Sequence, residues 1–226
     1  MFIKLNFENS NDIGVFIKLT NSYCIVPYDI SEKCLKILQK ELKKKIPIIK
    51  TSVLQSKCLG RLIIGNNKGL LLPSETTFEE FQKIKKYIPD NIIVKRCSEK
   101  FSALGNCIVN NDFAALAIPE ISYETEELLG DVLGTEVFKV SLGSEKLIGS
   151  FCVINNYGGL ISQFVSLEDQ DEISSLLQIP LTVGTINCGD KYLSSGLITN
   201  DWFGFCGFRT TQSEILVLET TFNKKI

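Results

Sequence analysis

The sequence predicts an α/β ring of five repeated units, with strands on the inside and helices on the outside. A lysine stands ten residues before a glycine four times, at Lys4 and Gly14, Lys50 and Gly60, Lys95 and Gly105, and Lys139 and Gly149. These glycines are 46, 45 and 44 residues apart, Gly196 follows 47 residues later, and asparagines at positions 21, 67, 111, 156 and 200 follow the same period. Self-similarity at roughly 20 to 50 residues is typical of solenoids, propellers and arrays. We therefore expect one domain over residues 1–226, built from repeats of about 45 residues.

The first eight residues predict the strand that closes the ring. They alternate as a strand does, and the lysine-to-glycine spacing makes them equivalent to residues 47–53, 92–99 and 136–142, the third strand of a unit. The last unit, which starts at Gly196, has 31 residues instead of about 45. The N-terminal strand is expected to complete it, since closure of a ring removes the bare edge of a sheet.

Each unit is expected to contain strands and one helix. In the first unit we predict a strand over Gly14–Leu19, a turn at Asn21, a strand over Tyr23–Val26, a helix over about Ser31–Leu42 and then a third strand. Helix starts are indicated where a hydroxyl residue stands three positions before an acid, as at Thr77 and Glu80, Ser166 and Asp169, and Thr211 and Glu214.

The last periodic segment, residues 215–222, fits two structures. Its alternation suits a strand, but Ile215, Leu218 and Phe222 also share one face of a helix. The order of elements in the other repeats favours the helix.

Composition indicates a globular protein without a membrane segment. Hydrophobic residues make up 44 % of the chain, no apolar run reaches 18 residues, and the sequence starting Met1-Phe2-Ile3-Lys4 leads into a repeat strand without a signal-peptide pattern. A soluble, unsecreted protein is expected. The eight cysteines are scattered without a Cys-x-x-Cys pair, which favours free thiols in a reducing compartment over a disulfide framework.

Histidine is absent from the sequence. This excludes Cys–His and Ser–His nucleophilic sites and histidine-based zinc sites. We expect no catalytic residue, no metal ion and no cofactor.

Charge is divided along the chain. Residues 1–100 carry 18 Lys and Arg against 10 Asp and Glu, a net charge of +8, whereas residues 101–226 carry 6 against 16, a net charge of −10. A ring of repeats is then expected to have one basic and one acidic side. The alternative is that these charges belong to ordinary solvated helix faces.

Several blocks closely resemble the eukaryotic translation initiation factor 6 family, in register over essentially the whole chain. These blocks are Phe7-Glu8-Asn9, Ile13-Gly14-x-Phe16-x-Lys18-Leu19-Thr20-Asn21-x-Tyr23-Cys24, Ser102-Ala103-Leu104-Gly105-Asn106, Glu168-Asp169-Gln170-Asp171-Glu172 followed by Ser174-Ser175-Leu176-Leu177-Gln178, and Asn200-Asp201-Trp202. The resemblance implies a pentein fold, a five-fold pseudosymmetric α/β propeller, which agrees with the ring expected from the repeat period.

The resemblance also implies a function. Members of that family bind the large (60S) ribosomal subunit at its intersubunit face, against a ribosomal protein and the sarcin-ricin loop. They act in biogenesis and nuclear export of that subunit and prevent its premature association with the small subunit. A GTPase and its helper protein release them. By this resemblance we expect a monomer of the cytoplasm and of the nucleus and nucleolus, with no membrane partner.

One departure from the family pattern lies at the end of the sequence. Animal and fungal members continue into a polar tail, whereas this sequence ends at Lys224-Lys225-Ile226. The resemblance therefore leaves regulation through such a tail open for this sequence.

Candidate contact residues follow the repeat glycines. Val15, Arg61, Asn106, Ser150 and Leu197 are expected to line one rim of the ring, where ordinary strand-start residues are the alternative interpretation. Arg61 and Asn106 offer several hydrogen-bond donors suited to carbonyls or phosphate. The resemblance places family contact residues at these two positions, so we predict that both bind the ribosome, with Lys57, Arg96 and Phe151 as companions.

Ser174 and Ser175 are candidate phosphorylation sites. They follow a run of acidic residues, a context that acid-directed kinases favour, and the resemblance implies modification there. The alternative is an amphipathic helix, carried by Ile173, Leu176 and Leu177, that half-buries one of the serines.

Two other classes of function are considered. The pentein fold also contains amidino-modifying enzymes, but these use a Cys–His pair that a chain without histidine cannot supply. A binding ring with another partner, such as a nucleic-acid clamp, is the second alternative. The acidic half argues against it because it repels phosphate.

Overall fold

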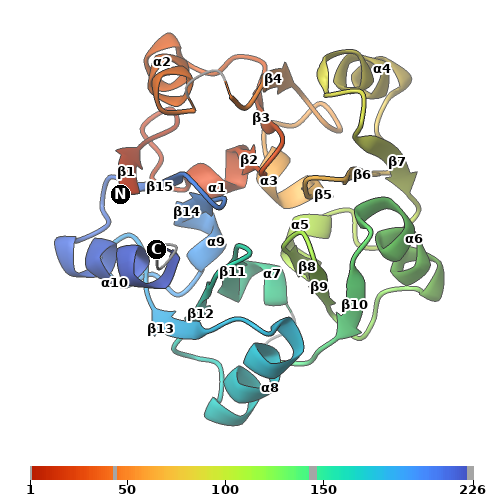
Figure 1. The fold of residues 1–226 in the computed structure, drawn as a ribbon. Helices are drawn as coiled ribbons and strands as arrows, with labels where there is room; N and C mark the ends of the chain where they lie inside the picture. Colours follow the sequence, from red (N-terminus) through yellow and green to blue (C-terminus); the bar gives the residue numbers. More distant parts are fainter. Residues whose placement is uncertain (1, 43–44, 143–146, 223–226) are drawn as a thin grey trace.

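Five similar units are arranged around a central axis (Figure 1). The structure is a computed structural model and describes residues 2–42, 45–142 and 147–222. Met1 and the end of the sequence at residues 224–226 lie outside the described residues. Within them, each unit has a three-stranded sheet, a long helix on the outside and a four-residue helix beside the axis. The predicted five-fold α/β ring is confirmed.

The elements follow one order in every unit. The first unit contains α1 (Ile13–Phe16), β2 (Lys18–Leu19), β3 (Cys24–Pro27), α2 (Glu32–Glu41) and β4 (Ile48–Thr51). The second contains α3 (Leu59–Leu62), β5 (Ile64–Gly65), β6 (Gly69–Pro73), α4 (Phe78–Tyr87) and β7 (Ile93–Cys97). The third contains α5 (Leu104–Cys107), β8 (Ile108–Asn110), β9 (Ala114–Ala117), α6 (Tyr123–Leu133) and β10 (Glu136–Lys139).

The last two units keep this order. The fourth contains α7 (Ile148–Phe151), β11 (Cys152–Ile154), β12 (Gly159–Ser162), α8 (Leu167–Leu177) and β13 (Leu181–Gly184). The fifth contains α9 (Leu193–Gly196), β14 (Leu197–Thr199), β15 (Gly204–Gly207) and α10 (Gln212–Phe222), and it takes its third strand, β1 (Phe2–Leu5), from the start of the chain.

The middle strand of each sheet pairs antiparallel with the first strand and parallel with the third. Every residue of the five middle strands is buried, because each has a strand of its own sheet on both sides and outer helices pack on the sheets. In the fifth sheet β1 pairs parallel with β15, from Phe2 opposite Gly204 to Leu5 opposite Gly207. The prediction that the N-terminal strand closes the ring is therefore confirmed.

The outer helices begin where the capping residues predict. The Thr77 hydroxyl accepts the Glu80 N–H while the Glu80 carboxylate accepts the Thr77 N–H, so α4 opens with a reciprocal capping box. Ser166 caps α8 through the N–H of Asp169. Residues 212–222 form α10, so the helical interpretation of the last segment is confirmed.

Three features of the repeat differ from the predictions. The predicted strand over Gly14–Leu19 begins instead with the one-turn helix α1, which is too short to leave a periodic pattern. In the fifth unit α9 aligns Ser194, not Gly196, with the repeat glycines, at 45 residues from Gly149. In the first unit Lys50 lies opposite Val26, the residue before Pro27. In the second unit Arg96, and not the predicted Lys95, takes this position, opposite Leu72 before Pro73.

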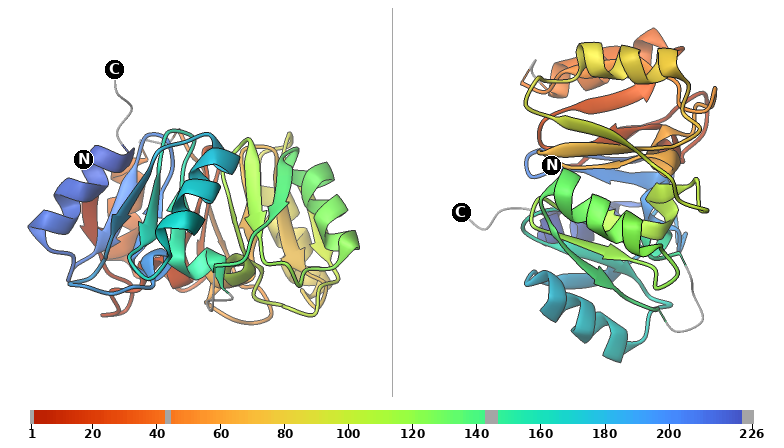
Figure 2. Two further views of the ribbon diagram at one scale, coloured as in Figure 1. Left: turned by 90° about the horizontal axis from the view of Figure 1, so that it is seen from below. Right: turned by 90° about the vertical axis from the view of Figure 1, so that its right-hand side faces the viewer.

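Strand directions give the ring two different faces, seen from the side in Figure 2. The hairpin face carries the turns between first and second strands, at residues 20–23, 66–69, 111–114, 155–158 and 200–203. The loop face carries the turns between third strands and one-turn helices, and the N-termini of the outer helices. The chain runs once around the ring, so the elements from α1 to β7 form units one and two on one side of it, and most of the basic half of the sequence lies there (Figure 1).

Candidate functional site

The centre of the ring is built from backbone that approaches backbone. A Cβ atom at Gly60 would lie 2.0 Å from the Gly14 carbonyl oxygen, and one at Gly105 would lie 2.4 Å from the Gly60 oxygen. A Cβ at Gly149 would likewise lie 2.3 Å from the Gly105 oxygen. The repeat glycines are required because each one-turn helix packs directly on its neighbour around the axis.

Ser194 takes the fifth position and adds a polar contact there. Its hydroxyl donates to the Gly149 carbonyl and accepts a hydrogen bond from Arg61 Nη1 at 2.5 Å. Arg61 belongs to α3, so its guanidinium reaches across the axis from the second unit to the fifth. Burial lowers the pKa of Arg61, while Asp12 and Cys58 act in the opposite direction. Part of this side chain therefore lies inside the ring, not on the predicted rim.

A cavity of about 110 Å³ runs along the axis and is lined by all five units. Its charged lining residues among the described ones are Lys18, Arg61, Asp112 and Asp201. Lys18 lies at the start of β2, and burial, followed by the charge of Arg61, lowers its pKa to about 8.

A relay of asparagine side chains surrounds the hairpin end of this cavity. Asn111 Oδ1 accepts the N–H groups of Phe113 and Ala114, and the equivalent asparagines make the same turn. Each Nδ2 then donates to the equivalent carbonyl of the next unit, from Asn66 to Asn111, from Asn111 to Asn155, from Asn155 to Asn200, and from Asn200 to Thr20. Thr20 has no amide, so the relay is not continued from the first unit to the second.

The next residues of these turns form a second relay. Backbone N–H groups donate to the side-chain oxygen of the following unit, from residue 67 to Asp112, 112 to Asn156, 156 to Asp201, and 201 to Asn21. The amides of Asn21 and Asn156 also bridge the Oδ2 atoms of Asp112 and Asp201 at 2.6 to 2.9 Å. Asn67 Oδ1 is buried without a hydrogen-bond partner among the described residues. Both relays are thus interrupted between units one and two.

The loop face positions the predicted contact residues. Asn106, in α5, is partly exposed, and its Oδ1 lies 3.5 Å from Ser150 Oγ. Lys57 forms ion pairs with Glu8 at 3.2 Å and Asp29 at 2.5 Å, which raise its pKa. Asn106 therefore offers its amide to solvent, whereas the Lys57 ammonium is already paired.

The turn before Lys57 is held by a glutamate. Leu54 and Gln55 have φ values of 54° and 55°, a left-handed conformation that is unfavourable for side-chain-bearing residues. The Glu80 carboxylate accepts their N–H groups at 3.1 and 2.9 Å and the Ser52 hydroxyl at 2.7 Å. Burial alone would raise the pKa of Glu80, but these hydrogen bonds and those of Thr77 outweigh it, and the pKa is lowered.

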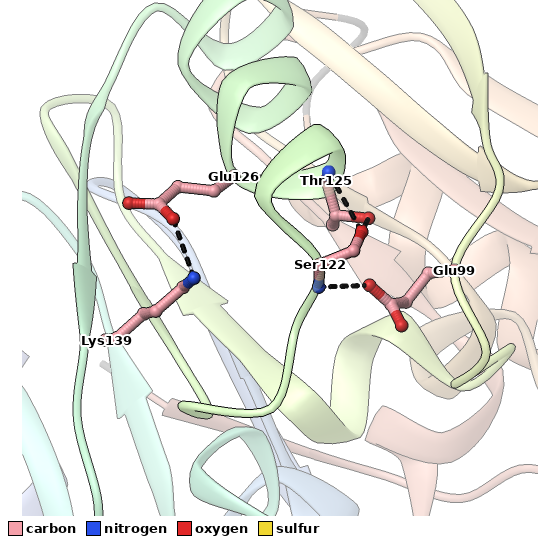
Figure 3. Close-up of polar contacts among 5 residues, drawn as sticks. All are labelled: Glu99, Ser122, Thr125, Glu126 and Lys139. Atoms are coloured by element: carbon pink, nitrogen blue, oxygen red, sulfur yellow. Dashed lines mark hydrogen bonds and ion pairs between the residues drawn. The ribbon is translucent and has the colours of Figure 1, made fainter.

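Carboxylates also hold the equivalent junctions of two other units. Glu214, at the position of Glu80 in α10, accepts the N–H groups of Cys188 and Gly189. Between the second and third units the direction is reversed: Glu99, in the turn after β7, accepts the N–H of Ser122, which caps α6, at 2.9 Å (Figure 3). The N-terminus of each of these outer helices is therefore tied to the turn of the preceding strand.

Two predicted companions have different positions. Arg96 is exposed on β7, with its guanidinium 4.9 Å from the centre of the Phe81 ring. Phe151 is 1 % exposed and packs against Tyr192 with ring centroids 5.3 Å apart. The prediction that Phe151 contacts a partner is corrected, because its side chain is part of the core of the ring.

Ser174 and Ser175 lie near the C-terminus of α8. Ser174 is partly buried and its hydroxyl donates to the Ile179 carbonyl, whereas Ser175 is exposed and donates to the Asp171 carbonyl. Of the two candidates, Ser175 is the more exposed.

Lys18 and Ser194 were missed as site residues by sequence reasoning. Counting 45 residues on from Gly149 would have found Ser194. The signal for Lys18 was its position in the repeat, at which the other units have an apolar residue, namely Ile64, Val109, Val153 and Ile198.

Comparison with known proteins then decides the family. The eIF-6 family profile matches residues 2–221. The chain belongs to the eIF-6 family. It is 47 % identical over 219 residues to eukaryotic translation initiation factor 6 of Tetrahymena thermophila, which covers 97 % of this chain and 89 % of that protein. It is 46 % identical over 222 residues to eukaryotic translation initiation factor 6 of Dictyostelium discoideum, which covers 98 % of this chain and 91 % of that protein.

A solved structure of low sequence identity has a similar fold. DDAH from Pseudomonas aeruginosa in complex with citrulline is 11 % identical, with a TM-score of 0.51 over 81 % of this chain and 71 % of that one. At this identity the likeness concerns the fold alone, a pentein fold. The eIF-6 relatives are named as initiation factors, whereas this structural neighbour is named as an enzyme, and this chain has no histidine for a Cys–His pair.

The described residues contain neither a membrane-spanning helix nor a cluster of metal ligands. None of their helices is both long and apolar enough to span a membrane. In the same part of the chain, no three or more Cys, Asp or Glu side chains are grouped to hold a metal ion.

Proposed function

We propose that this protein binds the large (60S) ribosomal subunit at its intersubunit face and prevents premature association with the small subunit. The observation that carries the proposal is the match to the eIF-6 family over residues 2–221, together with relatives named as initiation factors along nearly the whole chain. The protein also acts in biogenesis and nuclear export of the large subunit. It is a monomer of the cytoplasm, nucleus and nucleolus.

The loop face is the surface that meets the subunit. Asn106 supports this assignment because its partly exposed amide can donate and accept at once, and so can satisfy the backbone of a ribosomal protein. Arg96 and Lys57, in the basic half, lie toward the sarcin-ricin loop of the ribosomal RNA. Arg61 contributes through the part of its side chain that remains exposed at the axis.

Release requires other proteins. A GTPase and its helper protein remove the factor, and phosphorylation at Ser175, with Ser174 as the less accessible candidate, modulates its activity. The added charge lies beside Asp171 and near a helix C-terminus, where like-charge repulsion and the helix dipole both oppose it. Modification is therefore expected to loosen the end of α8.

A subunit-joining assay tests this function. Purified large and small subunits are mixed with increasing amounts of the protein, and joined ribosomes are measured on sucrose gradients. Joining should fall as the protein saturates the large subunit. Preincubating the protein with small subunits should not lower joining further. Undiminished joining at saturating protein would refute the anti-association role.

A further inference from the structure

The axial cavity holds two cationic side chains without a matching carboxylate. Lys18 and Arg61 both line it, and they lie close enough for the charge of Arg61 to lower the pKa of Lys18. Among the described residues, no carboxylate forms an ion pair with either side chain. Both side chains are partly buried, so their mutual repulsion is screened less than it would be on an open surface, and a counter-charge beside them would offset it.

The two acids that line the same cavity do not offset it. Asp112 and Asp201 accept hydrogen bonds from Asn21 and Asn156 at the hairpin end. Asp12 favours the charged form of Arg61 electrostatically, but it forms no ion pair with it. Both lining acids are therefore engaged with asparagine amides, and among the described residues neither forms an ion pair with Lys18 or Arg61.

The position of Lys18 in the repeat marks it as a special feature of the first unit. The equivalent residues of the other units are buried and apolar, namely Ile64, Val109, Val153 and Ile198. Both hydrogen-bond relays are also interrupted between units one and two, which contribute Lys18 and Arg61. Units one and two are joined at the hairpin turns by the Tyr23 hydroxyl, which donates to the Gly69 carbonyl at 2.8 Å, and by the Ser22 hydroxyl, which donates to the Asn67 carbonyl at 3.3 Å. A ligand held by Lys18 and Arg61 would add a contact between the two units beside the axis.

The size of the cavity permits such a ligand. A space of about 110 Å³ is several times the ~10–15 Å³ that one water molecule needs. It therefore has room for one monatomic anion together with water. An ammonium group and the free N–H groups of a guanidinium are strong donors to an anion.

We propose that the axial cavity binds one small inorganic anion of the size of chloride, between the Lys18 ammonium and the Arg61 guanidinium. The anion neutralises the repulsion between the two cations and connects the first unit to the second. Such a ligand binds the folded ring and not the unfolded chain, so it stabilises the fold by mass action.

Crystallography with bromide tests this directly on the unaltered protein. The protein is refolded and crystallised in bromide, which replaces chloride and scatters anomalously. The proposal expects an anomalous peak in the cavity within hydrogen-bond distance of Lys18 Nζ and Arg61. A cavity that contains only water, without a bromide peak, would overturn it.

A thermal-melting series gives an independent readout. Unfolding temperature is measured in sodium chloride and in sodium gluconate at equal ionic strength, because gluconate is too large for the cavity. The wild-type protein should melt several degrees higher in chloride, and this difference should vanish in Lys18→Met. The exposed lysine variant Lys50→Met is the matched control and should keep it. An equal chloride response in wild type and Lys18→Met would contradict the proposal, whatever the stability of the variant.

Discussion

Gly105 leaves room for a neighbouring backbone, since a Cβ atom there would lie 2.4 Å from the Gly60 carbonyl oxygen. Gly105→Ala is therefore expected to lower the free energy of unfolding by about 1–3 kcal/mol, as overpacking does. Urea unfolding measures this change. Gly130→Ala is the control, because a Cβ at that helical position lies 3.8 Å from its nearest neighbour, Thr135 O, and should be neutral or stabilising. Equal losses in the two variants would contradict the close packing at the axis.

The Glu80 carboxylate predicts a pH-dependent contribution to stability. Its folded-state pKa is lowered below the ordinary value of 4.5, so the ionised form stabilises the fold above that value, and this stabilisation is lost as the pH falls through the folded pKa. Glu80→Gln should cost about 1–3 kcal/mol at pH 7, because one carboxylate oxygen becomes an NH2 donor that faces N–H groups and the remaining hydrogen bonds lose the negative charge. Urea unfolding at several pH values should show this difference from wild type shrinking in acid.

Its neighbour in α4 provides the control. Glu79 is exposed, so Glu79→Gln should change the stability little at any pH. A Glu80→Gln deficit that stays constant down to pH 3 would show that the carboxylate charge does not support the turn at Leu54 and Gln55.

Asn106 is the residue on which the proposed contact depends most. Asn106→Ala should weaken binding to large subunits by about 1–3 kcal/mol, or roughly 5- to 150-fold, if its partner groups are left buried and unpaired. The melting temperature should hardly change, because the side chain is partly exposed and has one weak contact. Sedimentation with purified large subunits measures the affinity.

Asn91→Ala is the matched variant on the other face, since Asn91 is exposed in the turn between α4 and β7. It should bind as the wild type does. Parallel losses of melting temperature and binding in Asn106→Ala would instead make Asn106 a residue of the fold.

At the scale of elements, β1 supplies the third strand of the fifth sheet. Deleting residues 1–8 exposes the edge of β15 and uncovers Phe205, and should remove several kcal/mol of a typical ~5–15 kcal/mol stability. Thermal unfolding measures the loss. The point variant Lys4→Ala, which keeps the strand, should melt within a few degrees of wild type. A truncated chain that melts as the wild type does would refute closure by this strand.

Most elements could be predicted from the sequence, and the exceptions have physical reasons. Outer helices carry capping hydroxyls and amphipathic periodicity over ten or eleven residues, so their starts at Thr77 and Ser166 are visible in the sequence. The four-residue helices beside the axis have no room for periodicity and are fixed by packing on neighbouring units. In the fifth unit the prediction aligned Gly196 with the repeat glycines because it is a glycine, whereas the 45-residue period leads from Gly149 to Ser194.

At the scale of the whole molecule, the candidate site was only partly predictable. The rim position of Asn106 follows from the repeat alone, whereas the burial of Phe151 and the contact of Arg61 with Ser194 depend on units that are distant in the sequence. Periodicity places a residue on an element, but it does not say which way a long side chain turns at a pseudosymmetric axis.

The division of charge predicts the salt dependence of binding. If the basic half contacts ribosomal RNA, affinity for large subunits should fall as salt rises, since counterions released from phosphates favour the complex at low salt. The slope should be shallow if a protein partner carries most of the contact. Sedimentation at several salt concentrations measures this slope. An affinity independent of salt would mean that the interface consists of protein contacts without RNA.

The most direct test of the account is sedimentation of the unaltered protein with separately purified ribosomal subunits. Each subunit is centrifuged through a sucrose cushion with a limiting amount of protein, and the protein in pellet and supernatant is measured. We predict that it pellets with the large subunit and stays in the supernatant with the small one. Recovery with the small subunit, or with neither, would contradict the proposed function.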